Sequence, residues 1–332
     1  MIDSMYLPHV YWGLLALSIF IYAVLDGYDL GVGMLMPLRD KADKDKMVAS
    51  IGPFWDANET WLVLIVGLLF IAFPKAHSFA LSYLYLPVFV MLIGLILRGI
   101  AFDFRVKAPE HQRMAWDYAF KIGSAIAALS QGYMIGRYVT GFEESVFAYA
   151  FAVLSSYGVA IAYCFIGAAW LILKTEGALQ KRAIVWAQYS SRALFFGIAA
   201  ICWFSFMLYT DSAAEKMSNQ MLFISILVPS LCLFLFIRCE YNLTRKIGHD
   251  DAACWKPFVN AILVFLVCMI GLAYTIFPYI IPGKMLLVEV ASAPESLAFL
   301  LVGASVVIPL ILLYTAFTYW VFRGKVRDLS YE

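Results

Sequence analysis

Apolar residues fill long stretches of this chain, and shorter polar segments separate them. Because a helix needs about 20 apolar residues to cross the hydrocarbon core of a bilayer, each long stretch with few or no charges predicts a transmembrane helix. Nine such helices are expected, at Tyr6–Pro37, Trp55–Phe73, Phe79–Leu97, Tyr118–Tyr138, Ser145–Leu173, Ala193–Thr210, Met217–Ile237, Pro257–Phe277 and Ser296–Phe322. The second and fourth have short charge-free cores with charged residues at both ends, so eight helices are the alternative.

The basic residues predict how these helices are oriented. With nine helices and an external N-terminus, the external segments hold only Lys75, Arg137, Lys216 and Lys284, and all other Lys and Arg residues fall on the cytoplasmic side. Cytoplasmic loops of membrane proteins carry such an excess of basic residues. Removing one helix would invert every later loop and destroy the asymmetry. The charges therefore favour nine helices, with the N-terminus outside and the C-terminus inside.

Composition narrows the class of protein further. The 332 residues are 63% hydrophobic and 14% charged, which excludes an ordinary soluble enzyme and a disordered chain. Basic and acidic residues nearly balance, 24 against 23, so the chain is not a nucleic-acid-binding protein. No basic segment precedes the first apolar stretch, which favours a retained membrane anchor over a signal peptide. We expect one transmembrane domain over residues 1–332, in the inner membrane of a bacterium.

Cysteine and histidine suggest no metal site in this chain. The six cysteines include no CxxC pair and are expected to act as small apolar packing residues. The four histidines, His9, His77, His111 and His249, fall in predicted loops or at helix ends. Histidine is a frequent axial ligand of haem. If the protein works in redox chemistry, its haem ligands should therefore come from another chain.

The first predicted helix carries two acids in its interior. Asp26 and Asp29 stand three residues apart, hence on one helix face, near the middle of the membrane. An ionised Asp costs about 2.5–3.5 kcal/mol at this depth, so acids there are usually paired, hydrated or protonated, and often functional. A proton relay is one interpretation. The other is a packing role, which the close-approach pattern of Gly27 and Gly31 also favours, and the two are compatible.

A second polar motif, Gly52–Trp61, opens the second predicted helix. Asp56 and Glu59 have the spacing of a capping box, with Trp55 and Trp61 as interfacial aromatic residues. Alternatively, a carboxylate at this cytoplasmic mouth could supply protons to the first helix.

A third motif, Arg98–Arg105, ends the third predicted helix on the same side of the membrane. The topology therefore gathers Asp26, Asp29, Asp56, Glu59, Arg98 and Asp103 in one leaflet. Arg98 either neutralises one of the acids or extends its side chain to the interface.

These three motifs, taken in order and with their spacing, resemble subunit II of the cytochrome bd-type quinol oxidases. They are the segments Leu25–Gly33, Gly52–Trp61 and Arg98–Arg105, and the segment Ile308–Phe317 is also similar. The resemblance covers essentially the whole chain. Ala57 stands where many members have Gly, and Tyr28 where many have Phe. The short chain resembles the branch described as cyanide-insensitive oxidases.

The resemblance implies an all-α, polytopic membrane protein built from two four-helix bundles and one extra helix. The similar endings of Phe70–Pro74 and Tyr274–Pro278 agree with such a duplication. It implies a heterodimeric complex of the aerobic respiratory chain that oxidises quinol, such as ubiquinol, and reduces oxygen to water. Two b-type haems and one d- or b-type haem would be held by subunit I, so this chain would contribute no catalytic residue.

By the same resemblance, subunit II supports subunit I and lines a proton path from the cytoplasm. Asp56 would lie near its entrance, Asp29 and Asp26 further along, and Glu59 beside them. The supporting polar and aromatic residues would be Asn58, Arg98, Asp103 and Trp55. Some members also hold a quinone in this subunit, and a small single-helix subunit and membrane lipids are further expected partners.

A proton- or cation-coupled secondary transporter is the alternative function, because acids at mid-membrane are equally common there. Against it, helices broken by Gly or Pro do not recur at matching places in the two halves of the chain.

Overall fold

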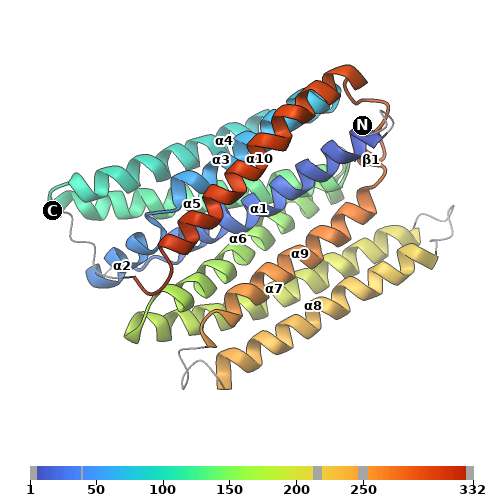
Figure 1. Cartoon of the computed structure of the whole chain (residues 1–332). Coiled ribbons are helices and arrows are strands. Elements are labelled where there is room, and N and C mark those ends of the chain that lie inside the picture. The colour runs from blue at the N-terminus through green and yellow to red at the C-terminus, as the bar shows by residue number, and fades with distance from the viewer. Residues whose placement is uncertain (1–5, 39, 212–218, 246–252, 327–332) are drawn as a thin grey trace.

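A computed structural model of the chain describes residues 6–38, 40–211, 219–245 and 253–326, with side chains except at 202–225 and 245. Long, roughly aligned helices dominate it (Figure 1). The helices are α1 Leu7–Leu35, α2 Lys41–Ile51, α3 Trp55–Ala72, α4 Pro74–Lys107, α5 Glu110–Val139, α6 Val146–Lys174, α7 Gly177–Asp211, α8 Asn219–Arg245, α9 Lys256–Ile276 and α10 Pro294–Val321. A two-stranded antiparallel hairpin, β1 Tyr279–Ile281 and β2 Met285–Leu286, precedes α10.

Each predicted apolar stretch corresponds to one long helix, and eight of these helices are long and apolar enough to cross a membrane. The exception is α5, which buries polar side chains such as Asp117 and Gln131. It nevertheless packs along both α4 and α6. A backbone approach near its middle joins it to α4, where a Cβ on Gly94 would lie 2.8 Å from Ala127 N.

The contacts at the two ends of the bundle require an odd number of crossings. The Tyr11 hydroxyl near the start of α1 donates to the Leu297 carbonyl near the start of α10, at 2.9 Å. The end of α10 lies instead beside the end of α6, where Lys174 donates to the Phe322 carbonyl at 2.5 Å. Helices α1 and α10 therefore run in the same direction, which fits nine crossings, with α5 included.

The nine long helices form two groups of four and one outlier. Helices α1, α3, α4 and α5 contact one another in a closed ring, and so do α6, α7, α8 and α9. The two rings meet mainly where α6 packs on α1 and α5. Helix α10 lies across the outside of α1 (Figure 1). This arrangement confirms the expected pair of four-helix bundles with an extra helix.

Glycines set the closest contact between the two rings, at the crossing of α1 and α6. A Cβ on Gly31 would lie 1.8 Å from the Tyr163 carbonyl oxygen, and one on Gly167 would lie 2.7 Å from the Gly31 carbonyl carbon. A Cβ on Gly27 would lie 2.7 Å from the Tyr163 ring. The predicted packing role of Gly27 and Gly31 is therefore confirmed.

The largest differences from the sequence expectation concern three features. Helix α2 was not predicted, because at 11 residues it is too short and too polar for an apolar stretch. Helix α7 begins at Gly177, well before the predicted Ala193, because the polar segment that precedes the apolar part continues the same helix. The hairpin was not predicted either, since its strands are only three and two residues long.

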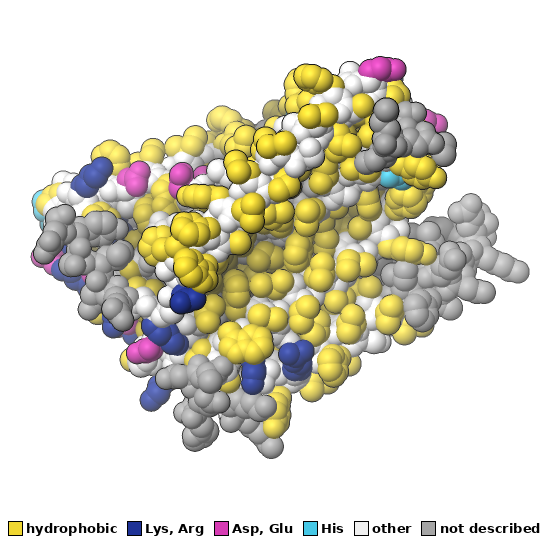
Figure 2. Space-filling model, in the orientation of Figure 1, with side chains coloured by type: hydrophobic (Ala, Val, Ile, Leu, Met, Phe, Trp, Pro, Cys, Tyr) yellow, Lys and Arg dark blue, Asp and Glu magenta, His cyan; other side chains and the backbone are white. Residues whose placement is uncertain are grey.

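The charged side chains lie mostly at one end of the helices. Figure 2 shows the Lys and Arg residues toward the lower left, around α2 and the turn between α6 and α7, while apolar side chains cover the middle. This distribution agrees with the predicted basic cytoplasmic side. The predicted external Lys216 lies outside the described residues.

Candidate functional site

The site is built around the two acids in α1. Asp26 and Asp29 are both 0% exposed, and they lie in a run of buried residues from Asp26 to Gly33. Helix α3 packs against one side of α1 and α6 against the other. The two carboxyl groups are therefore enclosed at the centre of the first helix ring.

Arg98 of α4 compensates part of this acidity. One guanidinium nitrogen, Nη1, donates to Asp26 Oδ1 at 2.8 Å, and the other, Nη2, donates to Glu59 Oε1 at 2.5 Å. The Arg98 side chain is 1% exposed. The guanidinium thus bridges an acid of α1 and an acid of α3. Of the two interpretations given above, Arg98 follows the first: it neutralises acids and does not extend to the membrane interface.

Asp29 is held differently, by the neutral amide of Asn58. Asn58 Nδ2 donates to Asp29 Oδ2 at 2.7 Å and to the Tyr28 hydroxyl at 3.0 Å. The Tyr28 hydroxyl in turn lies 2.5 Å from the hydroxyl of Tyr319 on α10. Asp29 forms no ion pair among the described residues.

Each acid of α1 keeps one buried oxygen without a hydrogen-bond partner among the described residues. These atoms are Asp26 Oδ2 and Asp29 Oδ1. A buried polar atom without a partner is costly, so such atoms usually mark a place that binds a proton or water. The chemistry open to this pair is therefore proton exchange.

The site opens toward the membrane through α3. The Glu59 side chain is 29% exposed, and Asp56, three residues earlier, is exposed on the surface. Asp56 and Glu59 do not form the capping box considered above. The N-cap of α3 is Phe54, without a side-chain cap, because the preceding turn continues directly into the helix. Glu59 is thereby free to bind Arg98.

Three other residues of the motifs form no hydrogen bond or ion pair with the acid pair in the part of the chain that the structure describes. Asp103 is exposed on α4 and forms no ion pair within the described part of the chain. Trp55 is partly buried and packs on the Phe102 ring, with centroids 4.9 Å apart. Trp61, one of the two aromatic residues considered for the interface, is instead 1% exposed. It turns inward because it lies on the face of α3 that packs against α1.

The motifs did not reveal a second polar group next to Asp26. Tyr163 of α6 donates to Gln131 Oε1 at 2.8 Å, and Gln131 Nε2 donates to Tyr22 at 2.7 Å. Tyr22 stands one turn before Asp26 on α1. Gln131 in a predicted membrane helix was the one available sequence signal, whereas tyrosines are too common in this chain to stand out.

Comparison with known proteins finds relatives over the full length of the chain. The family model for cytochrome bd terminal oxidase subunit II matches residues 7–322. The chain is 27% identical to the cytochrome bd-I ubiquinol oxidase subunit 2 of Escherichia coli strain K12, over 100% of this chain and 98% of that protein. It is also 27% identical to the cytochrome bd ubiquinol oxidase subunit 2 of Bacillus subtilis strain 168, over 96% of each chain.

A solved structure supports the fold. The chain superposes on the bd oxidase of Geobacillus thermodenitrificans with a TM-score of 0.66 at 12% identity, covering 95% of this chain and 96% of the other. With its long apolar helices, the protein is a multi-pass protein of the bacterial inner membrane. Its sequence, its fold and its full-length matches together show that the chain belongs to the family of cytochrome bd terminal oxidase subunit II.

Proposed function

We propose that this chain serves a respiratory quinol oxidase as its haem-free subunit and carries protons from the cytoplasm toward the oxygen-reducing centre of the partner, subunit I. As a subunit II, the chain is part of a quinol oxidase complex that reduces oxygen. The observation that carries the proposal is the line of acids from the surface to the interior: Asp56, Glu59, Asp26 and Asp29.

Arg98 positions the acids of this path but does not itself transfer protons. A guanidinium group has no acceptor and does not lose its proton in proteins, so no proton passes through it. Its role is to hold Glu59 and Asp26 at fixed positions. Protons would reach Asp26 Oδ2 and Asp29 Oδ1 through water, since these are the oxygens without a protein partner.

Reaction chemistry gives such a path its purpose. When quinol releases its protons outside and water formation takes protons from inside, charge is separated without a pump. Each charge moved across 100 mV stores about 2.3 kcal/mol. A one-sided route through the membrane is therefore part of energy conservation.

The haems are assigned to subunit I because this chain offers poor ligands. His9, His77 and His111 stand within the first turns of α1, α4 and α5, near the membrane surfaces. His77 packs on Phe70 and His9 on Phe277, with ring centroids 5.2 and 6.0 Å apart. His249 lies outside the described residues. Two b-type haems and one d- or b-type haem in the partner remain our proposal.

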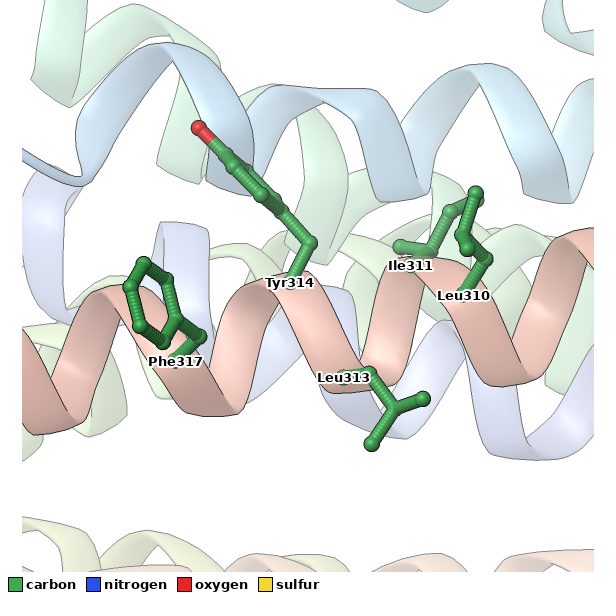
Figure 3. A pocket seen from close by; sticks show the side chains of 5 residues that line it. All are labelled: Leu310, Ile311, Leu313, Tyr314 and Phe317. Atoms are coloured by element: carbon green, nitrogen blue, oxygen red, sulfur yellow. The ribbon is translucent and has the colours of Figure 1, made fainter.

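Subunit I would cover the face formed by α3, α4 and α10. On α3, Val63, Val66 and Phe70 follow Glu59 on the same helix face, and all three are exposed. On α10, a shallow groove is lined only by apolar and aromatic side chains, including Tyr314, which points toward the neighbouring helix (Figure 3). A partly exposed Glu59 facing lipid would be costly, whereas a partner subunit could receive its protons. The proton path would cross the interface here.

The test compares Asp29→Asn and Asp56→Asn variants of the assembled oxidase. We expect slower oxygen reduction and slower proton uptake from the cytoplasmic side, with the haem spectrum unchanged. Glu143→Gln, on the external side between α5 and α6, is the control and should behave as wild type. Wild-type turnover in both Asp variants would leave these acids a structural role only.

Co-purification separates this function from the transporter alternative. A subunit II should leave the membrane together with a haem-bearing subunit, and the colour should stay with that partner on dissociation. A transporter would be purified alone and colourless.

A further inference from the structure

A closed ring of hydrogen bonds surrounds the amide of Asn58, next to Asp29. Asn58 Nδ2 lies 3.0 Å from the Tyr28 hydroxyl, which lies 2.5 Å from the Tyr319 hydroxyl. The Tyr319 hydroxyl returns to Asn58 Oδ1 through a long hydrogen bond of 3.5 Å. The ring thus joins α1, α3 and α10.

The chemistry of the three groups fixes the direction of the ring. An amide nitrogen only donates and an amide oxygen only accepts. Asn58 must therefore donate to Tyr28, Tyr28 to Tyr319, and Tyr319 to Asn58 Oδ1. The second N–H hydrogen of the amide is left to point at Asp29 Oδ2, 2.7 Å away, with the Leu25 carbonyl as a weaker acceptor at 3.3 Å. An inverted amide would place its oxygen against Asp29 Oδ2 and the Leu25 carbonyl oxygen, so these two acceptors set the orientation of the amide, and the ring holds it in place.

Packed aromatic side chains keep this ring in place. Tyr28 is 0% exposed and stacks on Trp170, with ring centroids 4.2 Å apart. Tyr319 packs on Phe54 at 4.5 Å. Because neither tyrosine can rotate without disturbing these contacts, the hydroxyl groups stay where the amide requires them.

The consequence concerns the two oxygens of Asp29. Oδ2 can accept from the Asn58 amide whether the carboxyl group is charged or protonated, and Oδ1 has no partner among the described residues. Asp26 and Glu59, in contrast, each form an ion pair with Arg98. A neutral donor favours the charged form of a carboxyl group less strongly than a guanidinium does, and Asp29 is the one of these three acids without a charged partner among the described residues.

We propose that Tyr28 and Tyr319 are positioning residues for Asp29: their hydroxyls hold the Asn58 amide in place against Oδ2, which leaves Oδ1 as the atom that takes up and releases the proton. This inference rests on the proposed function of Asp29 in proton transfer. Hydrogen bonds in a closed ring polarise one another, which strengthens the hydrogen bond from the Asn58 amide to the Asp29 carboxyl group.

The test uses the assembled oxidase with Tyr28→Phe or Tyr319→Phe, which remove one hydroxyl and keep the packed ring. Tyr157→Phe is the matched control, because Tyr157 is exposed on α6. Infrared difference spectra between oxidised and reduced enzyme report the carboxyl band of Asp29, identified by its absence in Asp29→Asn. We expect this band to shift in both ring variants, and oxygen reduction to slow about fivefold, the factor for one lost hydrogen bond. The control should keep the wild-type band and rate.

The charged groups that act on Asp29 are unchanged in these variants, namely Asp26 of α1, Glu59 of α3 and Arg98 of α4. A shift of the band would therefore come from the ring. Rates are taken per haem, so that poor assembly does not count as slow turnover, and Asn58→Ala gives a second route to the same band shift. An unshifted band and normal rates in the ring variants, with a slow Asp29→Asn, would overturn the positioning role alone. A normal Asp29→Asn would overturn the proposed function of Asp29 as well.

Discussion

Individual buried charged residues in this chain are stabilised by specific partners. Arg98 binds two carboxylates with separate nitrogens. Asp117 of α5 accepts hydrogen bonds from Lys44 of α2 and from Arg105 of α4, each at 2.5 Å. Removing one partner of a buried ion pair leaves an uncompensated charge, which is far more costly than removing both partners. The stability of the protein therefore depends on these matches rather than on the number of charges.

Substitution of Arg98 tests this dependence. We expect Arg98→Gln to destabilise the folded chain by about 3–5 kcal/mol, because Asp26 would be left buried without its cation. The measurement is the midpoint of thermal unfolding of the detergent-purified complex. The control is Arg238→Gln, an exposed site on α8, which should change the midpoint little.

A second substitution should rescue the first. When Asp26→Asn is added to Arg98→Gln, the buried charge disappears together with its partner, and most of the lost stability should return. A double variant as unstable as Arg98→Gln would mean that the guanidinium acts through shape and packing instead of charge.

At the scale of helices, close packing rather than apolar length fixes which helices touch. Helix α1 approaches α6 through Gly31 and Gly167, where side chains larger than hydrogen have no room. This approach brings Tyr163 against Gly27 and completes the wall behind the acid pair. The close-approach pattern was readable in the sequence, but its partner helix was not, because many small residues occur in the other apolar helices.

Adding one methyl group at this crossing tests the packing. We expect Gly167→Ala to cost at least about 1–3 kcal/mol, the usual range for overpacking, because the new Cβ would meet the backbone of Gly31. Gly158→Ala on the same helix is the matched control, since a Cβ there meets nothing within 4 Å. Thermal unfolding and haem retention by the complex report the outcome. Equal stability of the two variants would contradict the tight crossing.

Helix α2 is attached to the first ring by charges. Asp117 forms ion pairs with both Lys44 of α2 and Arg105 of α4. Arg105 also donates to Asp45 of α2 at 2.7 Å. The apolar side of α2 is buried at Met47, Val48 and Ile51. The helix therefore covers the cytoplasmic end of the bundle below the acid pair.

Removing the Asp117 carboxylate should weaken the attachment of α2 to the first ring. In Asp117→Asn, Lys44 would lose its carboxylate partner and Arg105 would keep only Asp45, so we expect faster amide hydrogen exchange in α2 than in wild type. Glu110→Gln is the control, because its ion pair with Lys41 is exposed and contributes little. Unchanged exchange in the Asp117 variant would show that apolar burial alone holds α2.

At the scale of the whole molecule, the two rings differ in the acidic residues that they carry. The described acids of the site, Asp26, Asp29 and Glu59, all belong to the first ring, which also presents the face of α3 and α4 beside α10. In the second ring, α7 and α8 carry an exposed ion pair between Arg192 and Glu240. Among the described residues, the buried acids of the proposed site thus lie in one half of the duplicated architecture.

The proposed position of subunit I is tested by photo-cross-linking in the membrane. A benzophenone amino acid at Val66 of α3 should form a covalent product with subunit I after illumination, because Val66 is 50% exposed on the proposed interface. The same group at Phe234 of α8, which is 59% exposed in the second ring, should label lipid and give no such product. Cross-linking from Phe234 and not from Val66 would place the partner on the other ring.

The sequence by itself determined the fold class and the nine long helices, because the energy of placing charges and backbone in lipid depends on local composition. Its basic residues also predict the orientation of these helices. It also identified the acids Asp26, Asp29, Asp56 and Glu59 as candidates for chemistry, since acids within apolar stretches are costly wherever they fall. The polar start of α7 and the short α2 escaped prediction for the same reason: their composition resembles that of a loop.

Only the tertiary structure decided which charges meet. Arg98 lies 72 residues from Asp26 in the chain and 39 from Glu59, and Tyr319 lies 291 residues from Tyr28. Such pairs are set by the rotation and depth of each helix against its neighbours, and these depend on the packing of all side chains at once. Helix rotation is likewise why Trp61 turned inward and Asp103 outward, although both stand in motifs with the site residues.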